Sequence, residues 1–119
     1  MNAPILLVGA SSGIGRAIAD RLHAQGIAFI TAGRRPTDFP VAHILYDATT
    51  DAFPDEQLPA ELGGLVYCPG SINLKPLRST KAEDLRAAFE LNVVGAFNAV
   101  QACADRLRKT PGSGIVLFS

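Results

Sequence analysis

The stretch 8-VGASSGIGRAIADRL-22 places glycines at positions 9, 13 and 15, directly before a segment with a helical pattern. It follows Ile5–Val8, a short and wholly apolar run that is typical of a parallel strand covered on both faces. A strand, a glycine turn and a helix N-terminus together form an anion site, because the unpaired N–H groups of the first helical turn point outward. The stretch therefore predicts a phosphate-binding loop at the first strand of the sheet.

The glycines of this loop suit a bound pyrophosphate. Glycine allows a sharp backbone turn and leaves no Cβ between the backbone and an approaching phosphate, and Ser11 and Ser12 add hydroxyl donors. The alternative is a plain strand-to-helix turn that uses glycine for geometry alone. The spacing differs from the G-x-G-x-x-G dinucleotide pattern, and the loop lacks the lysine of a G-x-x-x-x-G-K-[ST] P-loop, which argues against an NTPase.

The rest of the chain alternates between apolar runs and one long helical segment. The periodicity from Lys81 to Lys109 predicts a helix, and the segment Thr49–Leu62, with two prolines, reads as a loop or a single helical turn. Shorter apolar runs predict further strands at Ala28–Thr31, His43–Tyr46, Leu65–Tyr67 and Ile115–Phe118. This order predicts an α/β fold with a parallel sheet of about five strands, in one domain that covers residues 1–119.

Composition and charge exclude several classes of protein. The 11 basic and 11 acidic side chains balance, and the basic cluster of Arg106, Arg108 and Lys109 sits where cations complement a helix C-terminus rather than on a nucleic-acid surface. No apolar run approaches the roughly 18 residues of a membrane span, and the N-terminus lacks the basic region of a signal peptide. We therefore expect a cytoplasmic protein that binds neither nucleic acid nor membranes.

The two cysteines, Cys68 and Cys103, have neither a C-x-x-C spacing nor a spacing typical of metal ligands. We interpret both as reduced, mostly buried thiols, and we expect no metal site. No histidine lies near Cys68 in sequence to support a nucleophilic role for its thiol.

The predicted helix from Lys81 to Lys109 carries apolar residues on more than one side. Leu85 and Phe89 follow one face, whereas Leu91 and Phe97 lie largely off it. A helix with two apolar faces must be covered on two faces. The cover comes either from another subunit or from chain outside these residues, and we expect a homo-oligomer that forms through this helix.

The glycine spacing closely resembles the cofactor loop of the short-chain dehydrogenase/reductase family, whose usual form is T-G-x-x-x-G-I-G, with Val8 here in place of the threonine. The resemblance covers essentially the whole chain and implies a Rossmann-type doubly wound parallel sheet. The chain corresponds to the first half or so of a typical member, so we expect the C-terminal part of the family fold to be missing. The resemblance also implies that the cofactor contacts Gly9, Ser11, Ser12, Gly13, Ile14 and Gly15.

Two arginines favour NADP over NAD as that cofactor. NAD-binding relatives place an acidic residue about 20 positions after the glycine loop, where it binds the ribose hydroxyls. This chain instead has Arg34 and Arg35 after the second predicted strand, and guanidinium groups suit a 2′-phosphate but offer no acceptor to a free hydroxyl. A pair of solvated loop arginines is the alternative.

Two further segments match the cofactor-binding part of the family at the expected distances. Asp47 and Ala48 follow the third predicted strand, where the family places an Asp that hydrogen-bonds the adenine. Cys68 and Pro69 replace the Asn-Ala pair of the family's N-N-A-G motif, whereas Gly70 is kept. The resemblance implies that this segment contacts the adenosine half of the cofactor through its backbone.

Asn92 and Ser119 are the candidate catalytic residues. The segment 91-LNVVGAF-97 resembles the family's fourth-helix motif, which implies that Asn92 organises the active site through a backbone carbonyl and a water and lies at the cofactor site. An asparagine whose hydrogen bonds are satisfied locally is the alternative. Ser119 ends the segment GIVLFS, where the family places a serine pair that includes the substrate-holding residue.

The resemblance implies a hydride transfer in which a tyrosine gives the proton and a lysine four residues later supports it. Neither Tyr46 nor Tyr67 is followed by such a lysine, and we expect the family's Tyr-x-x-x-Lys pair beyond Ser119. One interpretation is therefore the N-terminal portion of an NADP(H)-dependent oxidoreductase that acts on a small ketone or secondary alcohol. The alternatives are a non-catalytic NADP-binding module or truncated product, and an α/β domain without a cofactor.

Overall fold

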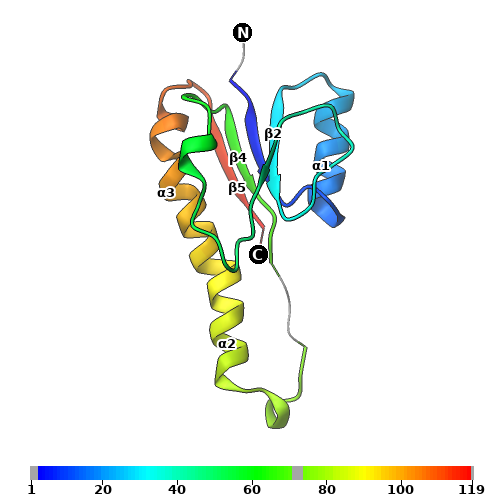
Figure 1. The fold of residues 1–119 in the computed structure, drawn as a ribbon, viewed down its shortest axis with the longest axis vertical. Coiled ribbons are helices and arrows are strands. Elements are labelled where there is room, and N and C mark those ends of the chain that lie inside the picture. Colours follow the sequence, from blue (N-terminus) through cyan, green and yellow to red (C-terminus); the bar gives the residue numbers. More distant parts are fainter. Residues whose placement is uncertain (1–2, 71–73, 119) are drawn as a thin grey trace.

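The computed structural model of the chain describes residues 3–70 and 74–118. Its centre is a parallel sheet of five strands in the order β3-β2-β1-β4-β5 (Figure 1). The strands are β1 (Ile5–Val8), β2 (Phe29–Gly33), β3 (His43–Leu45), β4 (Gly64–Tyr67) and β5 (Gly114–Leu117). All five predicted strands form, and the α/β parallel sheet expected from the sequence is confirmed.

Helices follow β1 and connect β4 to β5. The first is α1 (Gly13–Ala24), and the long connection contains α2 (Ala82–Phe89), the π-helical turn η3 (Glu90–Val94) and α3 (Gly95–Arg108) in direct succession. Two short 3₁₀ turns, η1 (Asp55–Gln57) and η2 (Leu77–Ser79), lie in the loops. The turn η1 confirms the single helical turn expected in the segment between the third and fourth strands.

The helix predicted from Lys81 to Lys109 forms along nearly its whole length, with one irregularity in the middle. At η3 the N–H of Gly95 donates to the carbonyl of Glu90, five residues earlier. In an α-helix the acceptor is four residues earlier. The predicted helix is therefore present but contains one wider, π-helical turn.

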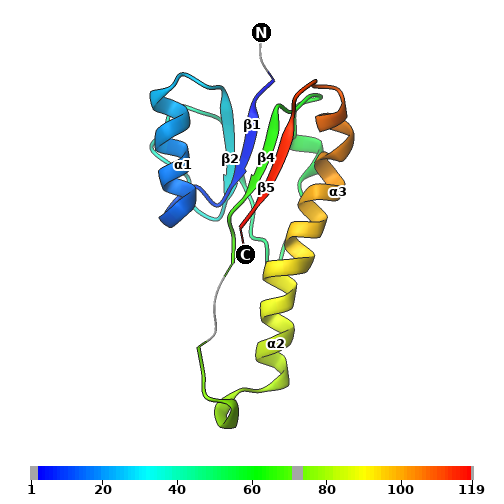
Figure 2. The same cartoon turned by 180° about the vertical axis from the view of Figure 1, so that it is seen from behind.

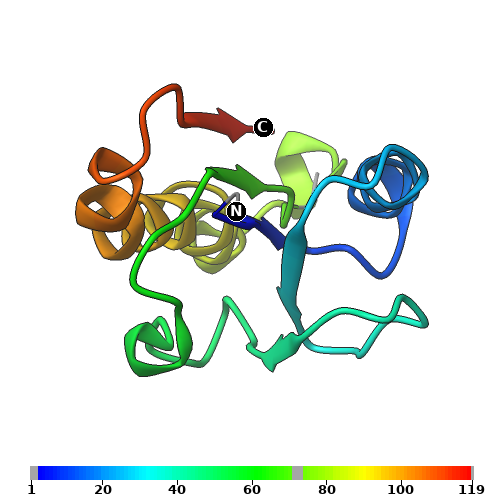
Figure 3. The ribbon, with the colours of Figure 1, turned by 90° about the horizontal axis from the view of Figure 1, so that it is seen from above.

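α1 covers one face of the sheet and α3 covers the other (Figures 2 and 3). A hydrophobic cluster lies between the sheet and each of these helices. Side chains alternate along β1, so that Leu7 points to the α1 side and Leu6 to the α3 side. The α1 side also contains Ala10, Ala19 and Phe29. The α3 side also contains Leu65, Tyr67, Ala99, Cys103 and Leu107. The sheet is therefore doubly wound, as a Rossmann-type fold requires.

Large apolar side chains remain exposed at one sheet edge and along one side of the long helix. Within the described residues, β5 pairs with β4 alone, and all four of its residues are exposed. On the helix, exposed apolar side chains recur every four residues, and we call them the exposed helix stripe: Leu85, Phe89, Val93 and Phe97. Among the described helices, none is both long and apolar enough to span a bilayer.

Candidate nucleotide-binding site

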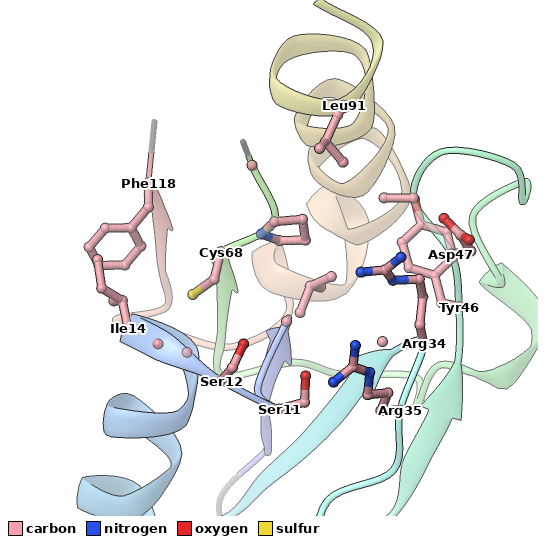
Figure 4. A pocket seen from close by; sticks show the side chains of 18 of the residues that line it. Ser11, Ser12, Ile14, Arg34, Arg35, Tyr46, Asp47, Cys68, Leu91 and Phe118 are labelled. Atoms are coloured by element: carbon pink, nitrogen blue, oxygen red, sulfur yellow. The ribbon is translucent and has the colours of Figure 1, made fainter. Parts of the chain in front are cut away.

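A cleft opens at the carboxyl ends of the central strands (Figure 4). The chain adds β2 and β3 on one side of β1 and then crosses to add β4 and β5 on the other side. Such a reversal between neighbouring parallel strands leaves a crevice outside their carboxyl ends, which is where open α/β sheets bind ligands. The cavity measures about 440 Å³, within the range of small-molecule sites.

The glycine loop forms the floor of this cleft. Gly9 and Gly13 have φ angles of +89° and +59°, which L side chains rarely adopt. A Cβ on Gly15 would overlap the carbonyl oxygen of Gly9, so that the start of α1 can pack this close to the loop only with glycine at position 15. Around Gly13 nothing lies within 4 Å of the place of a Cβ, which leaves the loop backbone open to a ligand.

Ser11, Ser12 and Ile14 are exposed residues that line the same cleft. Ser12 has an extended backbone and directly precedes α1, whose first turn carries no acidic residue. The positive end of the α1 dipole therefore faces the cleft without a nearby carboxylate of its own helix. The predicted succession of a strand, a glycine turn and a helix N-terminus is present here, and phosphate binding at it stays a prediction.

Arg34 and Arg35 follow β2 and also line the cleft. In Figure 4 they lie on one side of it, Ile14, Cys68 and Phe118 lie on the other, and the two serines lie between. Both arginines are exposed, and neither forms an ion pair with any residue in the described ranges. Two guanidinium groups thus face the cleft without a carboxylate partner.

Asp47 and Ala48 line the cleft beside Arg34. The Asp47 carboxylate accepts hydrogen bonds from the Thr49 hydroxyl at 2.6 Å and from the Thr49 N–H at 2.9 Å. These hydrogen bonds, together with the positive charge of Arg34, lower the pKa of Asp47 below its ordinary value. The side chain is therefore an ionised acceptor with a fixed orientation.

Cys68, Pro69 and Gly70 continue from β4 along the wall of the cleft. Burial raises the pKa of the Cys68 thiol to about 11, so the thiol keeps its proton at neutral pH and is a poor nucleophile. Pro69 lies against Gly9, where a Cβ on the glycine would stand 3.3 Å from the proline ring. This segment therefore brings backbone, rather than reactive side chains, to the cleft.

Asn92 lies in η3, behind the cleft rather than among the residues that line it. Its amide donates to the Ala88 carbonyl at 3.0 Å, and its side-chain oxygen lies so close to Gly70 that a Cβ there would stand 2.5 Å away. Asn92 thus touches the cleft wall through Gly70. Ser119, the other candidate catalytic residue, lies outside the described residues.

Five lining residues with side chains are not among the site residues predicted from the sequence: Val8, Tyr46, Thr49, Leu91 and Phe118. Tyr46 and Phe118 directly follow β3 and β5, so the rule that parallel strands end at one edge of the sheet could have found them. Leu91 reaches the cleft because the long helix runs beside the sheet and continues past the carboxyl ends of the strands (Figure 1). No local sequence pattern indicates that arrangement.

Comparisons with known proteins agree on one family. The family model described as short chain dehydrogenase matches residues 3–119. The chain is 30% identical to 2,3-dihydro-2,3-dihydroxybenzoate dehydrogenase of Escherichia coli (strain K12), over 94% of this chain and 48% of that protein. It is 26% identical to L-2,3-butanediol dehydrogenase of Corynebacterium glutamicum, over 98% of this chain and 53% of that protein.

A solved structure gives the same result. The fold superposes on a short-chain dehydrogenase from Streptomyces avermitilis with a TM-score of 0.80 at 30% identity, over 96% of this chain and 48% of that chain. The chain therefore spans about half the length of the curated relatives and of the solved structure that it matches.

Proposed function

The chain belongs to the short-chain dehydrogenase family, and on this premise we propose that its cleft binds NADP(H) as part of an oxidoreductase acting on a ketone or secondary alcohol. The observation that carries the proposal is the combination of an open glycine loop with two unpaired guanidinium groups in one cleft. The loop suits a pyrophosphate, and the guanidinium groups suit a further phosphate.

Each part of the cleft has a distinct role in this proposal. The loop from Gly9 to Gly15, with its two serine hydroxyls, holds the pyrophosphate through N–H and O–H donors. Asp47, Ala48 and Gly70 border the adenosine half. When bound, the nicotinamide supplies the hydride of the reaction. Asn92 and Ser119 remain the proposed catalytic contributors, through the roles that the family resemblance implies.

The two arginines support NADP rather than NAD. A 2′-phosphate offers guanidinium groups several charged acceptors, whereas the free ribose hydroxyl of NAD calls for an acceptor on the protein. Among the described residues no carboxylate lies within ion-pair distance of either arginine. The charge of Arg34 acts on the nearby Asp47 carboxylate, but both guanidinium groups keep donors for a phosphate.

The names of the two curated relatives, dehydrogenases of a dihydrodihydroxybenzoate and of a butanediol, support an alcohol as the reduced form of a small-molecule substrate. The exposed helix stripe supports a homo-oligomer. Two free thiols, Cys68 and Cys103, support a reducing, cytoplasmic location.

A non-catalytic NADP-binding module is the second candidate. It is favoured by one observation: the glycine loop and the cleft, which are all that nucleotide binding requires, lie within the described residues. The two candidates share the nucleotide site and differ in turnover. Oxidation of NADPH with a panel of ketones and diketones distinguishes them, because the binding module leaves NADPH unconsumed.

Titration with NADPH and NADH, followed by nicotinamide fluorescence, tests the shared site. We expect NADPH to bind more tightly, and we expect Arg34→Glu to weaken NADPH by about tenfold or more while changing NADH little, since charge-assisted hydrogen bonds contribute about 1.5–3 kcal/mol each. Arg21→Glu, at an exposed position of α1 outside the cleft, is the matched control and leaves both affinities unchanged. Equal affinity for the two nucleotides would contradict the NADP assignment.

A further inference from the structure

The widened turn η3 leaves one carbonyl group without its helical donor. In an α-helix the N–H of Gly95 would donate to the carbonyl of Leu91. Here it donates to the carbonyl of Glu90 instead. The Leu91 carbonyl is part of a half-buried residue, and backbone carbonyls removed from water need a partner from elsewhere in the molecule.

Tyr67 supplies that partner from the end of β4. Its hydroxyl donates to the Leu91 carbonyl, with 3.2 Å between the oxygens. The side chain is fully buried, and its ring packs in the cluster under α3. Burial raises the pKa of Tyr67 well above its ordinary value, so the hydroxyl retains its proton and remains a donor.

Gly95 allows this hydrogen bond to form. A Cβ at position 95 would overlap the Tyr67 hydroxyl oxygen. The Tyr67 hydroxyl therefore contacts the helix backbone directly. It lies between the Leu91 carbonyl, to which it donates, and Gly95, whose N–H donates to the Glu90 carbonyl. Tyr67 and Gly95 together account for the wider hydrogen-bond pattern at η3.

The same turn presents two groups to the nucleotide site. Leu91 points from the helix toward the cleft (Figure 4), where it is one of the lining residues. Its neighbour Asn92 packs against Gly70, which also lines the cleft. A shift of the turn would move both contacts at once.

We propose that Tyr67 is a positioning residue for the nucleotide site, whose hydroxyl fixes the widened turn so that Leu91 faces the cleft and Asn92 rests on Gly70. The proposal rests on the proposed function, because the position of Leu91 affects binding only if a nucleotide occupies the cleft. The alternative is that the Tyr67 side chain only fills the core.

The test removes the hydroxyl and keeps the ring, in Tyr67→Phe. The matched control is Ser113→Ala, which removes a hydroxyl that donates to the carbonyl of Leu107 at 2.7 Å near the far end of α3. Both variants lose one hydroxyl-to-helix hydrogen bond, but only Tyr67 adjoins the turn. Each is measured by amide hydrogen exchange of residues 90–96 and by NADPH affinity.

We expect Tyr67→Phe to speed exchange at residues 90–96 by about two- to tenfold and to weaken NADPH binding by a similar factor, the effect of one lost hydrogen bond. Ser113→Ala leaves both unchanged. In a Leu91→Ala background, Tyr67→Phe weakens NADPH by a smaller factor, because one of the two groups that it positions is gone and only the Asn92–Gly70 contact remains.

Three results would overturn the proposal. The first is NADPH affinity in Tyr67→Phe equal to that of the unchanged chain, and the second is an equal loss in Ser113→Ala, which would mark a general stability effect. The third is an undiminished loss in the Leu91→Ala background. If the unchanged chain binds neither NADPH nor NADH, the proposed function fails first and the positioning role fails with it.

A measurement on the unchanged chain covers the case in which Tyr67→Phe does not fold. The Tyr67 hydroxyl proton should exchange slowly enough to be seen by NMR and should show a cross-peak to the Gly95 α-protons when NADPH is present or absent. A rapidly exchanging hydroxyl without that cross-peak would overturn the proposal.

Discussion

Gly13 and Gly112 have the same kind of backbone geometry in different surroundings. Their φ angles are +59° and +78°, and neither has an atom within 4 Å of the place of a Cβ. Gly13 lines the cleft, whereas Gly112 lies in the turn between α3 and β5. A comparison of alanine substitutions at these two glycines therefore separates two effects. One is the loss of stability from a strained backbone, and the other is the loss of nucleotide affinity from a Cβ in the path of the ligand.

Gly13→Ala should destabilise the fold by about 1–2 kcal/mol, because alanine must adopt a left-handed conformation. It should also weaken NADPH binding by about tenfold or more, the loss of one charge-assisted hydrogen bond to a phosphate. Gly112→Ala should show the same change in urea denaturation and bind NADPH normally. If both variants bind NADPH equally well, the glycine loop is not the phosphate site.

At the scale of single residues, the sequence predicts which residues follow the ends of the strands. Gly13, Arg34 and Asp47 were all placed in the cleft, because a short apolar run fixes where a parallel strand ends. Leu91 was not placed there, since its position depends on how a distant helix packs over the sheet. Asn92 was assigned to the cofactor site and instead reaches it through Gly70.

At the scale of elements, the exposed helix stripe is the surface that most needs a partner. Phe89 and Phe97 remain 58% and 61% exposed, whereas aromatic side chains in a stable monomer are mostly buried. If the stripe forms the proposed homo-oligomer, a charge on one of its aromatic residues should weaken association.

Phe97→Glu should weaken self-association by about tenfold or more, since buried aromatic residues contribute most to interfaces. Sedimentation velocity over a range of concentrations measures the effect. Ala17→Glu adds the same charge at an exposed position of α1 and should leave association unchanged. A chain that sediments as a monomer at every concentration would contradict the proposal.

The long helix also shows what a local pattern omits. Its apolar periodicity predicted a helix from Lys81 to Lys109, and the observed segments run from Ala82 to Arg108. The widened turn inside it was not predicted, because it coincides with a hydrogen bond to Tyr67, which lies 24 residues earlier in the chain. Periodicity describes which faces are apolar and contains no information about such a contact.

At the scale of the whole molecule, three groups that ionise at alkaline pH, the half-buried Cys68 and the buried Cys103 and Tyr67, make the stability of the fold fall as the pH rises. Burial raises the pKa of Cys68 and of Cys103 from 9.0 to about 11, and it raises the pKa of Tyr67 as well. In the unfolded chain the thiols lose their protons near pH 9, whereas the folded protein retains them to about pH 11. The folded state therefore binds more protons in this interval, and its stability falls as the pH rises.

We expect the free energy of unfolding to be nearly constant from pH 7 to 8.5 and to fall by pH 11 by about 2 kcal/mol through the buried thiol of Cys103, with a smaller contribution from the half-buried thiol of Cys68. Urea denaturation at a series of pH values measures it. The double variant Cys68→Ala, Cys103→Ala should show a shallower decline. An equally steep decline in that variant would assign the effect to other groups.

The strand order has a consequence for folding during synthesis. Each strand pairs with one that the ribosome has already made: β2 with β1, β3 with β2, β4 with β1 and β5 with β4. The sheet can therefore grow outward from β1 in the order of translation, and every strand after β1 finds its first partner already made. Domains that assemble in this way reduce the time during which apolar strand edges are exposed on the nascent chain.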